Sequence, residues 1–117
     1  MKGGRMKKKL IIKQDGFKDC GAACLLSIIR YYGGDIAKGR LIELVKTTKD
    51  GTSFYNISLA ASHLGFAAKG FKLDEIDKIK EVNLPFISQV NKNGYMHFVV
   101  VYKINNNKIL IMNPSTG

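Results

Sequence analysis

The side chains best suited to nucleophilic chemistry in this sequence are two cysteines and two histidines. Cys20 and Cys24 lie four residues apart, whereas His63 and His97 are scattered. A thiol attacks as its thiolate, and it needs a base within hydrogen-bond reach. Two thiols and two scattered histidines lack the ligand spacing of a zinc site. We therefore expect thiol chemistry that needs no metal.

Cys20 has the surroundings of a reactive thiol. Asp19 precedes it and is predicted to be a helix N-cap. In the first helical turn, unpaired backbone N–H groups and the helix dipole favour an anion, and Gly21 lets a substrate backbone approach the sulfur. The alternative is a buried, inert cysteine. That alternative fits Cys24 better, because Cys24 lies one turn further in, beside Leu25.

His97 is the candidate base for this thiol. It begins an apolar strand directly after a hairpin turn at Asn93–Gly94. The alternative is a histidine on an exposed edge. His63 lies near the end of a predicted helix, where an imidazolium suits the dipole, and it is predicted to be structural.

Two amides complete the candidate site. Asn113 ends the last predicted strand, which a short turn places beside the start of the His97 strand, so its amide oxygen can orient the imidazole. Gln14 lies six residues before Cys20 and can donate to an oxyanion together with the backbone N–H of Cys20. The ordinary alternatives are a turn residue before a proline for Asn113 and a solvated loop residue for Gln14.

The elements that must position these residues form an α+β arrangement. Periodicity, caps and turn residues predict helices first and antiparallel strands second, with no internal repeat. Helices are predicted at residues 20–32, 38–45, 53–64 and 73–79, and extended segments or strands at 8–13, 66–71, 85–90, 95–104 and 108–112.

The length of 117 residues and the hydrophobic content of 45% fit one compact domain. The longest apolar runs, such as Phe98–Tyr102, are too short to span a bilayer, and Leu10–Ile12 is too short for a signal-peptide core. Reduced cysteines are the natural state in the cytosol. By itself the chain is therefore predicted to be soluble and cytosolic.

The net charge of +10 is uneven, because residues 1–13 contribute +6 of it. A basic end can bind nucleic acid or anionic lipid, and the alternative is a flexible, solubilising tail. No aromatic residues alternate with the basic ones as a single-strand binding face requires, so no nucleic-acid partner is predicted. The milder basicity of the remaining residues favours an acidic peptide.

Three segments, in order, resemble the peptidase C39 family of bacteriocin-processing endopeptidase domains. Residues 14–25, QDGFKDCGAACL, resemble the nucleophile segment of that family. His97–Val101 resembles its histidine strand, and Asn113–Pro114 stands where the family has Asp-Pro. The resemblance covers nearly the whole chain. It implies a basic flexible tail at residues 1–7 and a C39-like peptidase domain at residues 8–117, which we expect to be shortened at its C-terminus.

The resemblance implies a papain-like fold at the N-terminus of an ABC exporter, on the cytoplasmic face of the bacterial membrane. It implies a cysteine endopeptidase that removes the leader of a bacteriocin-like precursor after a Gly-Gly pair, with Cys20 as nucleophile, His97 as base and Gln14 as oxyanion donor. The implied partners are that precursor peptide and the transmembrane and nucleotide-binding domains of the exporter. ATP belongs to those transporter domains, and no cofactor is expected for the peptidase domain.

One departure from the family concerns Asn113, where the usual residue is Asp. An amide orients an imidazole but stabilises the imidazolium less than a carboxylate does, so we expect a working but slower peptidase. One alternative is a catalytically silent leader-binding docking domain of an exporter; another is a different papain-like acyl-transferring enzyme or a small redox protein. Contact with the leader is predicted within residues 36–64, at Phe54 and Tyr55.

Overall fold

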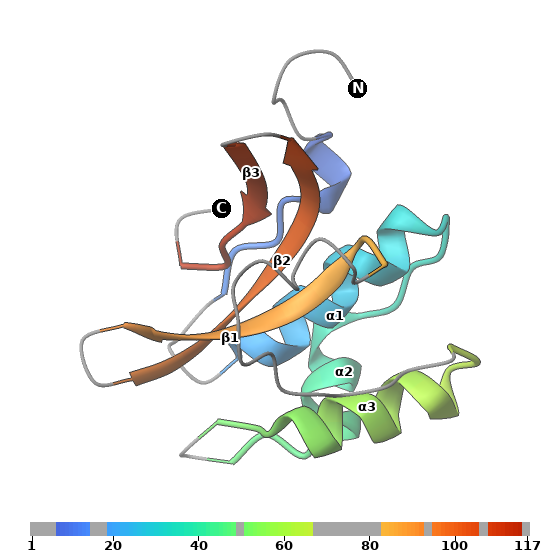
Figure 1. Cartoon of the computed structure of the whole chain (residues 1–117). Coiled ribbons are helices and arrows are strands. Elements are labelled where there is room, and N and C mark those ends of the chain that lie inside the picture. Colours follow the sequence, from blue (N-terminus) through green and yellow to red (C-terminus); the bar gives the residue numbers. More distant parts are fainter. Residues whose placement is uncertain are drawn as a thin grey trace.

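The computed structural model describes six segments of the chain, and Figure 1 shows their arrangement. They are residues 7–14, 19–48, 51–66, 83–92, 95–105 and 108–115, of which the side chains of 91, 92, 95 and 96 are not described. The elements in chain order are η1 (Lys8–Leu10), α1 (Cys20–Tyr31), α2 (Lys38–Leu44), α3 (Phe54–His63), β1 (Phe86–Lys92), β2 (Tyr95–Asn105) and β3 (Lys108–Met112). The strand predicted at 66–71, apart from Phe66, and the helix predicted at 73–79 lie outside the described residues.

The central element is α1. It contacts η1, β2, α2 and α3, and Figure 1 shows it between the sheet and the two shorter helices. Every residue from Cys20 to Ser27 is buried, although the periodicity of Leu25 and Ile29 predicted burial on one face only. The helix is buried on more than one face because the sheet, η1, α2 and α3 pack around it. Gly33, with φ of 90°, ends the helix as predicted.

The strands form an antiparallel sheet in the order β1-β2-β3. Lys92 pairs with Tyr95, which leaves two residues between β1 and β2 and confirms the predicted hairpin. The pairing of β2 with β3 ends at Val100 and Met112. The first residues of β2 therefore extend past the end of β3, and this end of the strand faces α1.

The core lies between the sheet and α1. Alternate residues of β2 point toward the helix, as expected for a strand with one face on the core. The side chains of β2 and β3 in the core cluster are Phe98, Val100, Tyr102 and Met112, and those of α1 are Cys20, Ala22, Ala23, Cys24, Leu25, Leu26 and Ile29.

Two short helices cover the other side of α1, close to their predicted positions. Ser53 caps α3, because its Oγ accepts the N–H of Asn56 at 3.2 Å. Gly65, with φ of 95°, follows the end of α3. The Thr52 hydroxyl donates to the Val45 carbonyl oxygen and so ties the entry of α3 to the end of α2. No helix in the described part of the chain is long and apolar enough to cross a membrane.

The N-terminal segment differs from the strand or extended entry predicted at residues 8–13. Lys8–Leu10 is a 3-10 turn, and the chain is extended only after it. The Leu10 N–H donates to the Lys7 carbonyl oxygen at 3.0 Å, so backbone groups that a strand would pair with a neighbour are satisfied locally. Leu10 and Ile12 are both buried in the core.

A buried pair of hydroxyl groups ties α1 to η1 and to β2. Ser27 Oγ donates to the Leu10 carbonyl oxygen at 2.5 Å, so the Tyr102 hydroxyl, 2.6 Å from Ser27 Oγ, is the donor of the second bond. Burial raises the pKa of Tyr102 to about 12, despite the opposing effect of the Ser27 bond. The phenol therefore stays protonated near neutral pH and can keep donating.

We expect Ser27→Ala to lower the free energy of unfolding by about 1–3 kcal/mol, because it leaves the Leu10 carbonyl and the Tyr102 hydroxyl unsatisfied in the interior. Tyr102→Phe removes the second hydroxyl and leaves Ser27 bonded to Leu10, so it is expected to cost less. Urea unfolding of both variants measures the difference. A larger loss for Tyr102→Phe would contradict this assignment of donors.

Candidate active site

The predicted nucleophile opens the central helix. Cys20 is the first residue of α1 and is 5% exposed. Asp19 stands at the N-cap position, but its backbone is not extended as an N-cap usually is, and its side chain makes no capping hydrogen bond. Its carboxylate lies 3.7 Å from Lys38 Nζ, at the start of α2. The predicted side-chain cap is therefore wrong, and the Asp19 carboxylate is near a cation of another helix.

Opposing influences act on the Cys20 thiol. Burial is the largest, and it raises the pKa of the thiol above its ordinary value of 9.0. The backbone N–H groups of Phe98, Gly21 and Cys20 itself lower this pKa, and the Asp19 carboxylate raises it. The predicted help from N–H groups at the helix start is thus present, but burial outweighs it. A base beside this thiol would therefore favour its reaction.

The Cys20 thiol interacts with the backbone N–H of Phe98, which belongs to the peptide bond between His97 and Phe98. The thiol therefore lies near the start of the strand that carries His97. Cys20 and His97 are 77 positions apart in the sequence. They meet because β3 pairs with β2 only as far as Val100, and the N-terminus of α1 lies against the part of β2 beyond that point. His97 is 7% exposed, so the peptide and the thiol share a largely dry environment.

The His97 ring is held by Asn113. Its Nε2 lies 2.7 Å from Asn113 Oδ1, which also accepts the backbone N–H of Ser115 at 3.0 Å and the Ser115 hydroxyl at 2.8 Å. A backbone N–H can only donate, so the atom of Asn113 that faces it is the oxygen, and His97 Nε2 must be a donor. In the neutral ring the proton is then on Nε2, which leaves Nδ1 as the basic nitrogen.

Gln14 is anchored beside this pair through its backbone. Its N–H donates to the carbonyl oxygen of Pro114, the residue after Asn113, at 2.8 Å. Its side-chain Oε1 is buried and has no hydrogen-bond partner among the described residues. Buried amides normally use their hydrogen-bonding capacity. The unpaired atom is an acceptor that can take a hydrogen bond from a bound molecule, whereas the oxyanion role predicted for Gln14 uses the Nε2 donor.

Gly21 serves the packing of helices rather than access to the sulfur. A Cβ atom at this position would lie 2.6 Å from Thr52 Cγ2 and 3.1 Å from Ile57 Cδ1. The first of these separations is shorter than side-chain atoms tolerate, so only glycine lets the start of α3 approach α1 here. The role predicted for Gly21, to admit a substrate backbone, is therefore wrong, because the space beside it is filled by the protein itself.

The other residues singled out in the sequence lie around this site. Cys24 is fully buried, and burial raises the pKa of its thiol well above the ordinary value, as suits a structural role. His63 is exposed in the last turn of α3. Phe54 is half-buried, with its ring edge-on to Phe98 at 5.1 Å between centroids. Tyr55, in contrast, is 71% exposed, so of the two predicted leader contacts it is the more accessible.

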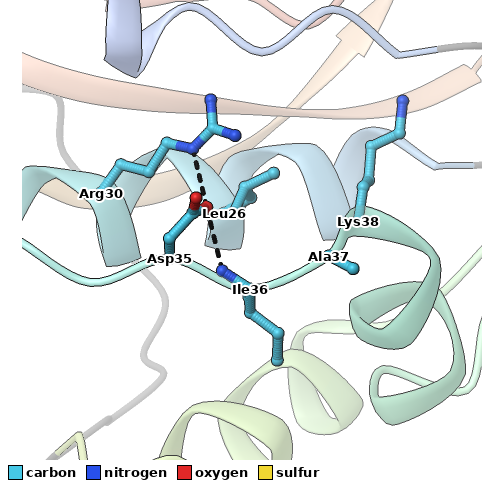
Figure 2. Close-up of a pocket in the computed structure, with 6 residues that line it drawn as sticks. All are labelled: Leu26, Arg30, Asp35, Ile36, Ala37 and Lys38. Atoms are coloured by element: carbon cyan, nitrogen blue, oxygen red, sulfur yellow. Dashed lines mark hydrogen bonds and ion pairs between the residues drawn. The ribbon is translucent and has the colours of Figure 1, made fainter.

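A shallow, open hollow lies along α1 and is not lined by Cys20 (Figure 2). It has a volume of about 330 Å³ and is lined by Leu26, Arg30, Asp35, Ile36, Ala37 and Lys38. Figure 2 shows Arg30 and Lys38 at opposite ends, with the 3.1 Å ion pair between Arg30 and Asp35. This hollow does not include Cys20 or His97, nor the predicted leader contacts Phe54 and Tyr55. Among the described residues, no three potential metal ligands lie together.

Three contacts of the site were not predicted. The Lys38 ammonium near Asp19 and the Phe98 N–H at Cys20 depend on how distant segments pack, and no local pattern announces them. Ser115, which donates twice to Asn113, did have a signal. A side chain of the Asn type commonly accepts the N–H two residues on, and such turns often contain proline and serine.

Comparison with known proteins identifies the family of this chain. The model of the peptidase C39 family matches residues 8–117. The chain is 43% identical over 112 residues to the lactococcin-G-processing and transport ATP-binding protein of Lactococcus lactis subsp. lactis, which covers 94% of this chain and 16% of that protein. It is 38% identical over 99 residues to the pediocin PA-1 transport/processing ATP-binding protein of Pediococcus acidilactici, with 82% and 14% covered. The chain thus spans about a sixth of the length of these relatives.

Solved structures give the same result for the fold. The peptidase domain of Streptococcus ComA, described as a bi-functional ABC transporter involved in quorum sensing, superposes with a TM-score of 0.80 and 33% identity over 90% of this chain and 78% of that one. A double glycine motif protease from an AMS/PCAT transporter, in complex with the leader peptide, gives a TM-score of 0.83 and 29% identity over 92% and 74%. The predicted papain-like α+β fold is confirmed, and the chain belongs to the peptidase C39 family.

Proposed function

We propose that this chain is a cysteine endopeptidase domain that removes the leader of a bacteriocin-like precursor after a Gly-Gly pair. One observation carries the proposal. The Cys20 thiol lies at the peptide bond between His97 and Phe98, and the bond from His97 Nε2 to Asn113 leaves Nδ1 as the basic nitrogen. A thiol, a base with a fixed tautomer and an orienting group are the parts that thiol acyl transfer needs.

In the first half of the proposed reaction, Cys20 Sγ attacks the carbonyl carbon of the scissile peptide bond as its proton passes to His97 Nδ1. The oxyanion of the tetrahedral intermediate accepts hydrogen bonds from the Gln14 side-chain amide and the Cys20 backbone N–H. When the C–N bond breaks, the imidazolium of His97 gives its proton to the leaving amine. The products of this half are the free C-terminal peptide and a thioester on Cys20.

In the second half, His97 takes a proton from a water molecule that attacks the thioester carbonyl. The thioester C–S bond breaks, the sulfur regains a proton from the imidazolium, and the leader leaves as a carboxylic acid. Asn113 keeps the ring in one orientation throughout both halves, because its oxygen is itself held by Ser115. This restraint supports proton transfer from one fixed nitrogen.

The proposed partners follow from the relatives rather than from contacts of this chain. The names of the relatives combine processing, transport and ATP binding, and one structural neighbour is complexed with a leader peptide. For this chain we therefore propose two kinds of partner. One is a precursor peptide with a double-glycine leader, and the other is the transmembrane and nucleotide-binding domains of an exporter, on the cytoplasmic face of the membrane. Tyr55, exposed on α3, remains the better candidate of the two predicted leader contacts.

Cys20→Ala is expected to lower cleavage of a synthetic double-glycine leader peptide by at least about 10³-fold, measured by mass spectrometry of the two fragments. Cys24→Ala is the matched control, because it removes the other thiol of the same helix. It should keep most activity and cost roughly 1 kcal/mol of stability as a small buried cavity forms. Peptide that binds the wild-type protein and stays uncut would favour the silent docking domain instead.

Asn113→Asp is expected to increase kcat/KM by roughly threefold to tenfold, or about 0.6–1.4 kcal/mol of transition-state stabilisation. All three hydrogen bonds that His97 and Ser115 make to Asn113 end on Oδ1, and a carboxylate can accept each of them. The carboxylate also stabilises the imidazolium that forms in the reaction.

Asn113→Ala serves as the comparison for this prediction, since it removes the oxygen and should slow cleavage strongly. Steady-state kinetics of the three proteins on one leader peptide test the order Asp, Asn, Ala. An Asp variant that is no faster than the natural Asn113 protein would refute the idea of a weaker orienting partner.

A further inference from the structure

Lys38 joins two segments that carry proposed catalytic groups. Its ammonium donates to the Lys13 carbonyl oxygen at 3.3 Å and lies 3.7 Å from the Asp19 carboxylate. Lys13 precedes Gln14, and Asp19 precedes Cys20. One cation at the start of α2 therefore contacts the residue before the proposed oxyanion donor and the residue before the proposed nucleophile.

The contact with Asp19 is largely shielded from solvent, whereas the contact with the Lys13 carbonyl oxygen is exposed. The Asp19 side chain is 9% exposed and the Lys38 side chain 22% exposed, so their attraction is screened less than that of a surface pair. Figure 2 shows Lys38 at the end of the hollow opposite Arg30, with its side chain extended alongside α1. A carboxylate as buried as that of Asp19 needs a compensating cation, and Lys38 supplies one.

Contacts between successive pairs of residues form a ring around the site, and Lys38 is part of this ring. Cys20 meets the His97–Phe98 peptide, and His97 is bonded to Asn113. Pro114, the next residue, accepts the Gln14 N–H. The remaining link, from the Gln14 segment back to Cys20, runs through Lys38. This link adds to the hydrogen bond from Ser27 to the Leu10 carbonyl oxygen, which joins the same N-terminal segment to α1 further along the helix.

Besides its contacts, the positive charge of Lys38 affects the ionisation of the Cys20 thiol. Among the described residues, the charged and titratable side chains that act on the Cys20 thiol are Asp19, which precedes it, and Cys24, one helical turn further on, and the thiol also lies beside the His97–Phe98 peptide of β2. The Asp19 carboxylate raises the pKa of the Cys20 thiol. A cation beside that carboxylate offsets its field at the sulfur.

We propose that Lys38 is a positioning residue of this site, which holds the segments of Gln14 and Cys20 together and neutralises the Asp19 carboxylate next to the nucleophile. The role in cleavage rests on the proposed function. The role at the thiol can be measured without any substrate, so the two can fail separately.

The test uses the full chain with Cys24→Ala, so that iodoacetamide alkylation reports on Cys20 alone. Lys38→Met removes the charge and both contacts while it keeps much of the side-chain volume. We expect alkylation near pH 8 to slow by about tenfold, with the pH profile moved to higher pH, because the loss of a positive charge beside the Asp19 carboxylate disfavours the thiolate. On a double-glycine leader peptide, kcat should fall by about tenfold with little change in KM.

Two further variants separate this role from general stability. Lys38→Arg keeps the charge and should restore most of both rates, whereas Arg40→Met removes a cation from the exposed face of the same helix and should change neither.

If Lys38→Met does not fold, the combination of Lys38→Met with Asp19→Asn removes both charges and should alkylate at least as fast as the parent protein. A folded Lys38→Met protein that matches Arg40→Met in its pH profile would overturn the proposal. An alkylation shift in a protein that cuts no leader peptide would instead sink the proposed function and leave the role of Lys38 at the thiol intact.

Discussion

The candidate site depends on one packing constraint, which is the burial of the first turn of α1 against the end of β2 that β3 does not cover. Because β3 ends at Met112, opposite Val100, the strand beyond Val100 is open toward the helix. Cys20 meets the His97–Phe98 peptide there. The same chain end supplies Asn113, the first residue after β3, and this explains why the orienting amide reaches His97 Nε2.

This burial has a cost and a benefit for thiol chemistry. It raises the pKa of Cys20, so the helix start alone does not produce the thiolate that its N–H groups would favour in a more exposed position. In return, the low dielectric strengthens each interaction with charge that develops at the sulfur or at an oxyanion. The balance gives the base a defined task. In the proposed reaction His97 takes the proton, and its bond to Asn113 fixes the tautomer that this task needs.

The sequence was sufficient for those parts of the fold and the site that local signals encode. Caps and glycines predicted the ends of α1 and α3, and the turn residues predicted both strand pairings. Hairpin geometry then placed Asn113 near His97. The errors concern contacts between distant segments. Asp19 looked like a cap and is near Lys38 instead, and Gly21 looked like an opening and is filled by Thr52, because in each case the neighbour comes from a segment whose position no local pattern specifies.

The departure of Asn113 from the Asp usual in this family is easier to understand as a matter of geometry than of charge. The oxygen of Asn113 accepts three hydrogen bonds, from His97 and twice from Ser115, and each restrains the amide whether or not it carries a charge. Orientation of the imidazole therefore survives the loss of the carboxylate, while stabilisation of the imidazolium is reduced. A site closed by contacts on every side can keep its arrangement with a weaker electrostatic partner. Asn113 is thus compatible with the proposed catalysis, because its hydrogen bonds to His97 and Ser115 do not depend on a charge.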